Sequence, residues 1–190
     1  MSLALALTLV ACLPSVEPSP PRPTMTPDAC AEPSLIELDK GWRFSTDPDE
    51  AGVSRGWYTP SFDDSDWCPL SPGSPWEESG ADYDGVAWYR TTVILPDWSR
   101  VYLGFGEVDD AATLWVDGER QMSWEAGDWD SEAQALDITD FADPGASVAL
   151  ALRISDRGGY GGVKGIIRLS EEPRGVMGES EYIRYLFESN

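Results

Sequence analysis

The sequence predicts an all-β fold, an antiparallel β-sandwich of the jelly-roll type. Three observations lead to this prediction. From Leu35 onward, short runs of β-forming residues alternate with turn signals, and one of these runs has apolar residues at every second position. No long segment repeats its apolar residues at the spacing of a helix. Strands that follow one another without helices between them favour antiparallel sheets over a parallel α/β fold.

Seven segments are predicted as strands. In chain order they are Gly41–Ser45, Ala87–Leu95, Val101–Gly106, Ala111–Val116, Gln134–Ile138, Ser147–Ile154 and Val163–Ser170. Within Ser147–Ile154 the apolar residues occupy alternate positions, which predicts a strand with one face turned to the core. Residues 89–95 follow the same period. Asp117-Gly118 is a two-residue hairpin signal, and the glycine-rich stretch 158–162 marks a turn.

The N-terminal residues predict an export signal. Residues 3–10 form an apolar run too short for a membrane-spanning helix. The run ends in Leu9-Val10-Ala11-Cys12, which resembles the lipobox of bacterial lipoproteins and implies cleavage before Cys12 and lipidation of its sulfur. Residues 1–11 are therefore predicted as a lipoprotein-type signal peptide, although they contain no Lys or Arg. The expected location is the bacterial cell envelope, lipid-anchored at the outer membrane or cell surface; a secreted or periplasmic protein is the alternative.

Residues 12–34 are predicted to be a proline-rich linker. The stretch from Leu13 to Pro33 is dense in proline, which blocks helices and central strands and favours an extended spacer. At ~3.1 Å per residue, the part of this stretch from Leu13 to Ala29 would reach about 50 Å from a membrane surface. In an exported protein Cys30 and Cys68 can form a disulfide that fastens the linker to the domain, with two free thiols as the alternative.

Composition excludes several classes of function. The chain has 34 Asp and Glu against 13 Lys and Arg, a formal charge of −21. Such a surface repels phosphate backbones and anionic lipids, so we expect no nucleic-acid partner and membrane contact only through the lipid anchor. A neutral glycan is compatible with this charge. The absence of His excludes catalytic triads and metal sites that depend on imidazole.

Nine segments, in order, resemble the N-terminal sugar-binding domain of family 2 glycoside hydrolases such as β-galactosidases and β-glucuronidases. They are Gly41-Trp42-Arg43-Phe44, Gly56-Trp57-Tyr58, Phe62-Asp63-Asp64-Ser65-Asp66-Trp67, Pro75-Trp76-Glu77, Gly85-Val86-Ala87-Trp88-Tyr89-Arg90, Leu103-Gly104-Phe105-Gly106-Glu107-Val108-Asp109-Asp110, Leu114-Trp115-Val116-Asp117-Gly118, and the pair Asp137-Ile138-Thr139 and Leu150-Ala151-Leu152-Arg153-Ile154. The resemblance implies a galactose-binding-like jelly roll over residues 35–172, followed by a C-terminal tail, 173–190.

The resemblance implies carbohydrate binding without catalysis. In the family this domain precedes a catalytic barrel, and a (β/α)₈ barrel needs about 200 residues or more. We therefore expect a non-catalytic carbohydrate-binding module of a surface lipoprotein, and a separate catalytic chain as a potential partner. The alternatives are a structural or protein-interaction module that has lost sugar binding, and a truncated glycoside hydrolase. One departure from the family is the loop 156–162, which is almost entirely glycine after Asp156.

Aromatic residues beside carboxylates are the candidate ligand-binding residues, because sugars stack their C–H faces on rings and donate hydroxyls to carboxylates. The candidates are Trp76, Glu77, Tyr83, Asp84, Trp124, Trp129 and Tyr160. The tryptophans within the strand and turn motifs are expected in the core instead: Trp42, Trp67, Trp88 and Trp115.

Two acidic motifs are interpreted as structural. In the segment Phe62–Trp67 the Asp and Ser side chains are expected to bond turn N–H groups while the flanking rings plug the core. A cation site is the alternative, because galactose-binding-like folds often hold a structural Ca²⁺; no ligand set is predicted, since calcium needs about six to eight oxygens. The pair Asp109-Asp110 is expected to bond backbone at a strand entry. No catalytic residue and no cofactor is predicted.

Overall fold

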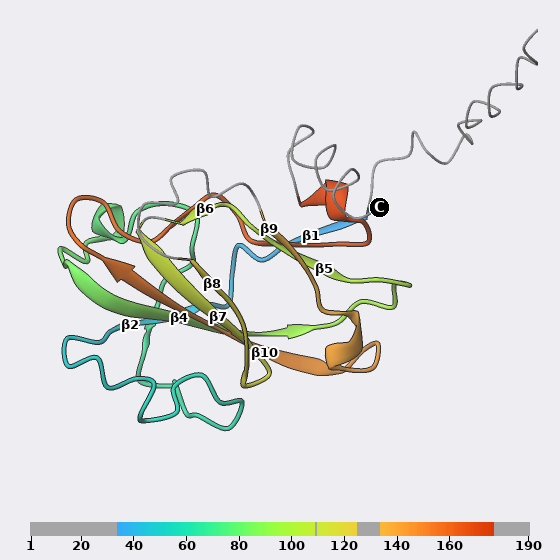
Figure 1. Cartoon of the computed structure of the whole chain (residues 1–190), viewed down its shortest axis with the longest axis horizontal. Coiled ribbons are helices and arrows are strands. Elements are labelled where there is room, and N and C mark those ends of the chain that lie inside the picture. Colours follow the sequence, from blue (N-terminus) through green and yellow to red (C-terminus); the bar gives the residue numbers. More distant parts are fainter. Residues whose placement is uncertain (1–33, 109, 125–133, 177–190) are drawn as a thin grey trace, which may run out of the picture. The chain divides into compact units, whose positions relative to one another are not determined.

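The computed structural model describes residues 34–108, 110–124 and 134–176, which form an antiparallel β-sandwich (Figure 1). Its larger sheet has six strands. In spatial order they are β3 (Cys68–Pro69), β2 (Arg43–Thr46), β4 (Gly85–Ile94), β10 (Ser147–Asp156), β7 (Ala111–Val116) and β8 (Glu119–Trp124). The long strands β4 and β10 pair along their whole length and form the centre of the sheet.

The second sheet has four strands and faces the first. In spatial order they are β1 (Leu35–Glu37), β12 (Arg168–Ser170), β5 (Tyr102–Phe105) and β9 (Gln134–Asp137). A small ribbon pairs β6 (Glu107–Val108) with β11 (Val163–Lys164), and the 3₁₀ turns are η2 (Trp76–Ser79), η3 (Thr139–Phe141) and η4 (Pro173–Gly175). No helix among the described residues is long and apolar enough to cross a membrane.

The core lies between the two sheets. On β10 the residues at positions 148, 150, 152 and 154 are completely buried, as their alternation predicts. From the opposite sheet Leu103 and Leu169 join them. Val176 is also buried, and its side chain occupies the space beside Gly104 where a Cβ would stand. The sandwich therefore extends a few residues beyond the boundary predicted at 172.

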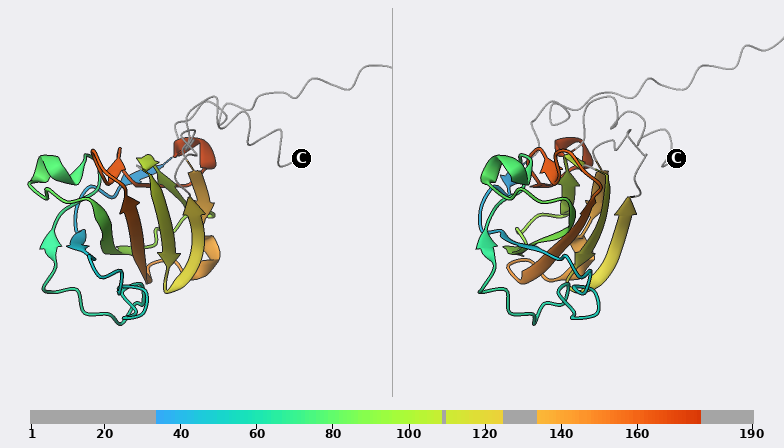
Figure 2. Two further views of the ribbon diagram at one scale, coloured as in Figure 1. Left: turned by 60° about the vertical axis from the view of Figure 1, so that its left-hand side comes forward. Right: turned by 90° about the vertical axis from the view of Figure 1, so that its left-hand side faces the viewer.

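The outer face of the six-stranded sheet is covered by residues 47–67, called here the wall loop (Figure 2). Every second residue of β4 and β10 points to this side, including Val86, Trp88 and Ala151. They form a second hydrophobic cluster with Trp57 of the wall loop and Trp115 of β7. This cluster fixes the wall loop against the strands.

The all-β fold and six of the seven strands are confirmed with ends that differ by no more than two residues. Two differences from the predicted strands follow from glycine. Gly41 has a φ of +82°, so β2 begins after it rather than at it. Gly165 has a φ of +96° and divides the segment predicted as one strand into β11 and β12. The strands β1, β3, β6 and β8 were not predicted, and β1, β3 and β6 are too short to show a period.

Candidate functional site

A groove of about 570 Å³ opens on the outer face of the six-stranded sheet. One side is the wall loop, and the floor is formed by β7, β8 and β10. Its lining residues are Glu50, Val53, Tyr58, Thr113, Trp115, Gly118, Arg120 and Arg153. This groove combines open volume, aromatic rings and hydrogen-bond donors, so we treat it as the candidate binding site.

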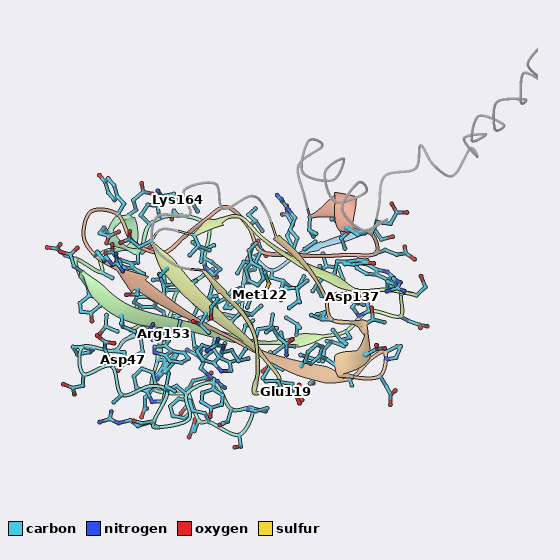
Figure 3. All side chains as sticks on the ribbon, in the orientation of Figure 1. Asp47, Glu119, Met122, Asp137, Arg153 and Lys164 are labelled. Atoms are coloured by element: carbon cyan, nitrogen blue, oxygen red, sulfur yellow. The ribbon has the colours of Figure 1, made fainter. Side chains whose placement is uncertain are left out.

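Asp47 fixes the start of the wall loop. Its carboxylate is buried and accepts the N–H groups of Ala51 at 2.8 Å and Gly52 at 2.9 Å. The same carboxylate accepts the indole N–H of Trp88 on β4 at 3.0 Å. Gly52 is required here because a Cβ would lie 2.6 Å from the nitrogen of that indole. Loop and strand are therefore joined by one buried anion with three donors; Figure 3 labels Asp47 and Arg153 on the side of the sheet that the loop covers.

Arg90 fixes the end of the wall loop. Its buried guanidinium donates to Asp64 at 2.8 Å and to the carbonyl oxygens of Trp57 and Thr59. The guanidinium also lies 5.3 Å from the centre of the Phe62 ring. A planar donor fork of this kind holds three acceptors in one orientation. The wall loop, whose residues border the groove, is thus held at its start by the Asp47 carboxylate and at its end by the Arg90 guanidinium of β4.

A stack of three rings leads from the core to the groove. Trp88 and Trp115 are stacked with centroids 5.1 Å apart, and Trp115 stacks on Tyr58 at 5.4 Å. Exposure rises along the stack: Trp88 is 0% exposed, Trp115 is 7% exposed, and Tyr58 is only half-buried. Tyr58 is therefore the ring at the groove that remains accessible to a ligand.

Two arginines reach the groove from strands on either side of β7. Arg153 of β10 lies opposite Thr113, and Arg120 of β8 lies opposite Trp115. The second pairing depends on a β-bulge, because the register of β7 and β8 shifts between Leu114 and Trp115. The shift brings Arg120 rather than its neighbour beside Trp115, on the face that carries the groove.

Trp76 was predicted from the sequence to bind a ligand, and the structure contradicts this prediction. It was expected in an open loop, but it is 0% exposed and belongs to the main core. Its indole N–H donates to the carbonyl of Tyr83 at 2.9 Å. The loop closes the end of the sandwich with this ring, so Trp76 has no free face for a sugar.

Four other predicted residues lie around this same end of the sandwich. Glu77 accepts the N–H of Gly161 with both carboxylate oxygens, so the loop 158–162 folds back on η2. Tyr83 is half-buried, and burial raises the pKa of its hydroxyl. Asp84 is exposed, and Tyr160 is 62% exposed at the tip of the glycine-rich loop. Tyr160 and Asp84 remain open to a ligand; whether they bind one stays a prediction.

Asp156 lies beside this group and was not predicted as a site residue. It is 4% exposed, one oxygen accepts the N–H of Gly158 at 2.9 Å, and the other has no hydrogen-bond partner. Burial raises the pKa of this carboxyl, and the nearby Asp84, Asp110 and Glu77 raise it further against the opposing bond from Gly158.

The remaining predicted positions are only partly described. Trp124 ends β8, where it lies opposite Ala112, while Trp129 lies outside the described residues. Cys68 is exposed in β3 and carries no disulfide to another described residue. Cys12 and Cys30 lie outside the described residues, so the lipidation and the Cys30–Cys68 disulfide stay predictions.

The acidic motifs have structural partners. In Phe62–Trp67 the carboxylate of Asp63 accepts the N–H of Ser65. Hydrogen bonding by the side chain of Ser65, and secondly by its backbone, lowers the pKa of Asp63. Phe62 and Trp67 pack on the outer cluster rather than in the central core. Asp110 accepts the N–H of Arg157 at 2.6 Å, next to the start of β7, as expected for a strand entry. Within the described ranges no three Asp, Glu or Cys side chains come together as a metal-binding group.

The sequence signals for the groove were present but did not identify it. Arg153 alternates with the core-facing residues of β10, so the period-two pattern of the strand alone places it on the outer face. What the sequence does not show is that Tyr58, Arg120 and Arg153, from three distant segments, border one space.

No protein-family model matches the chain. A β-glucuronidase from Paenibacillus borealis is 32% identical over 132 residues, and the match covers 66% of this chain and 20% of that protein. The chain therefore spans about a fifth of the length of this curated relative.

Solved structures share the fold. A β-glucuronidase from Ruminococcus gnavus, in complex with uronic isofagomine, superposes with a TM-score of 0.61 and 21% identity over 73% of this chain and 28% of that one. A glycosyl hydrolase family 2 member from Bacteroides cellulosilyticus gives a TM-score of 0.57 and 21% identity over 72% of this chain and 20% of that one. These matches confirm the family resemblance and the fold that it implied. The sandwich is homologous to part of a β-glucuronidase and has the jelly-roll fold of the N-terminal domain of family 2 glycoside hydrolases.

Proposed function

We propose that this domain binds carbohydrate without catalysing a reaction, and that the groove between the wall loop and β7, β8 and β10 is its binding site. The observation that carries the proposal is the groove itself, which presents the Tyr58 ring next to hydrogen-bond donors from two strands. A volume of about 570 Å³ lies within the range of pockets that hold small organic ligands.

The relatives support a sugar as the ligand. The structures that share this fold include a Ruminococcus gnavus β-glucuronidase in complex with D-glucuronic acid. This chain matches less than a third of that protein, so the hydrolysis of glucuronides by the relatives does not transfer to the sandwich. The described residues also contain no pair of carboxylates in the groove: Glu50 is the single acidic residue of its lining.

Glycan arrays and affinity electrophoresis with the full chain test the proposal, with two tyrosine variants as a matched pair. Tyr58→Ala removes the accessible ring of the groove and should weaken the binding of any retained glycan at least tenfold, about 1.4 kcal/mol. Tyr160→Ala removes the exposed ring at the other candidate site and should leave affinity unchanged, while thermal unfolding verifies that both variants are folded.

The two variants separate the two locations. Loss of binding in Tyr160→Ala with none in Tyr58→Ala would move the site to the loops around η2, where Asp84 and Tyr160 are exposed. Failure of the folded wild-type chain to bind any glycan would overturn the proposal.

The cellular context that we propose is a lipid-anchored protein of the bacterial envelope. It rests on the motif Leu9-Val10-Ala11-Cys12 and the proline-rich stretch after it. Detergent-phase partitioning of the expressed chain checks it: the wild type should enter the detergent phase and Cys12→Ala should not. Recovery of both proteins in the aqueous phase would overturn the lipid anchor and favour the alternative, a secreted or periplasmic protein.

A protein-interaction role is the second candidate, because the edge strand β1 exposes two large apolar residues. Leu35 is 47% and Ile36 is 38% exposed, and exposed apolar edge strands are ready templates for pairing with another chain. A chain that binds no glycan but shifts to a dimer, or retains a defined envelope protein through β1, would favour this role.

A further inference from the structure

The charge of the groove is opposite to the charge of the chain. The whole sequence carries a formal charge of −21, with only 13 basic residues in 190. The groove lining nevertheless holds two of these, Arg120 and Arg153, and one acidic residue, Glu50. Its local formal charge is therefore positive. A cationic groove on an acidic protein favours an anionic group of the ligand at that place.

One lining arginine is already paired with a carboxylate that is exposed to water. A nitrogen of Arg153 lies 3.1 Å from an oxygen of Glu50, and the Glu50 side chain is 68% exposed while that of Arg153 is 23% exposed. Ion pairs exposed to water in this way contribute little to stability. A ligand carboxylate can therefore replace Glu50 at little cost, with the guanidinium fork already positioned to receive it.

The second arginine completes the set of donors. Arg120 is exposed, and it has no ion-pair partner within the described ranges. Through the β-bulge it stands beside Trp115, whose ring is stacked under Tyr58. The two guanidinium groups thus border the same space as the accessible aromatic ring.

We propose that the groove selects a carbohydrate that carries a carboxylate, a uronic acid residue, with its ring on Tyr58 and its carboxylate bound by Arg120 and Arg153 in place of Glu50. This inference rests on the proposed function and specifies its ligand. It replaces the neutral glycan that the overall composition predicts. The reason is distance: at physiological salt, charges more than about 8 Å apart are largely screened, so the two contacting arginines outweigh the distant carboxylates.

The test uses two disaccharides of the same linkage, one ending in glucuronic acid and one ending in glucose, measured with the full chain by calorimetry. The wild type should bind the glucuronate at least tenfold more tightly. Arg120→Gln and Arg153→Gln should each lower glucuronate affinity about tenfold and leave the weak binding of the glucose-ended sugar unchanged. Glu50→Gln should raise glucuronate affinity severalfold, because it removes the competing carboxylate.

Matched variants change the same charge elsewhere. Arg100→Gln removes an exposed arginine that is paired with Asp137 at 2.6 Å, and Glu37→Gln removes an exposed glutamate that is paired with Arg168 at 3.4 Å. Neither Arg100 nor Glu37 lines the groove. Both variants should bind as the wild type does, which would separate a local effect of the groove from the net charge of the chain.

The outcomes distinguish this inference from the proposed function. Equal affinity for both sugars, lost in Tyr58→Ala, would keep the carbohydrate site and overturn its selectivity for uronates. Glucuronate binding that survives both arginine substitutions would also overturn the selectivity, as would equally tight binding of a sulfated disaccharide. No binding of either sugar would overturn the proposed function itself.

Discussion

The two sides of the six-stranded sheet each bury a carboxylate, but the two carboxylates differ in how many hydrogen bonds they accept. On the outer side Asp47 receives three N–H donors, two from the wall loop and one from Trp88. On the inner side Asp156 ends the core-facing series of β10 with one oxygen unpartnered, and the buried hydroxyl of Tyr89 also has no partner. A fully bonded buried charge organises the chain around it, whereas an under-bonded one costs stability.

The two sides of the sheet are also held in place by different interactions. The inner side is specified by apolar alternation, and its polar groups lie at the margin of the core. On the outer side charged groups, Asp47 and Arg90, hold a loop of irregular structure against aromatic rings. The groove depends on this second kind of order, because Tyr58 and Glu50 belong to that loop.

The same substitution at the two carboxylates should have opposite effects, and the larger effect belongs to Asp47. Asp47→Asn keeps only one acceptor oxygen where three donors converge, and it directs amide hydrogens at groups that are themselves donors. We expect the free energy of unfolding to fall by about 3 kcal/mol, since bonds to a charged group are the strong ones. Urea unfolding measures this loss.

Asp47→Asn should also affect the groove. Limited proteolysis should cut within the wall loop faster than in the wild type, and glycan affinity should fall with it. An unfolding midpoint equal to that of the wild type, with an intact loop, would show that the Asp47 hydrogen bonds do not anchor the loop.

Asp156→Asn should stabilise the protein, by about 1 kcal/mol at pH 7. Burial raises the pKa of Asp156 above its ordinary value of 3.8, so the folded state binds this proton more tightly than the unfolded state does. Stability from this group is therefore fully present below pH 3.8 and is lost as the pH rises through the folded-state pKa. The Asn variant keeps the acceptor for Gly158 and cannot ionise.

Urea unfolding midpoints at two pH values measure the effect of Asp156→Asn on stability. The variant should exceed the wild type at pH 7, and the difference should shrink as the pH is lowered towards 3.8. A difference of the same size at both pH values would mean that ionisation of Asp156 has no part in it. Stabilisation at Asp156 beside destabilisation at Asp47 would sharpen the contrast between the two sides.

The sequence predicts the inner side far better than the outer one. Period-two alternation in Ser147–Ile154 identified a strand with one face turned to the core, because burial on one face leaves a local pattern. The groove leaves no such pattern, since its residues come from segments that are distant along the chain. Trp76 failed as a ligand residue for a related reason: a loop tryptophan can cover the end of a sandwich, and only the tertiary contacts of η2 reveal this.

The first and last strands of the sandwich are neighbours, since Leu35 of β1 pairs with Ser170 of β12. Both belong to the four-stranded sheet, while the groove opens on the outer face of the six-stranded sheet; Figures 1 and 2 show the strands of these two layers. Leu35 and Ser170 therefore lie side by side on the layer opposite the groove. A label attached to β1 or β12 would lie on that layer and leave the proposed binding groove unobstructed.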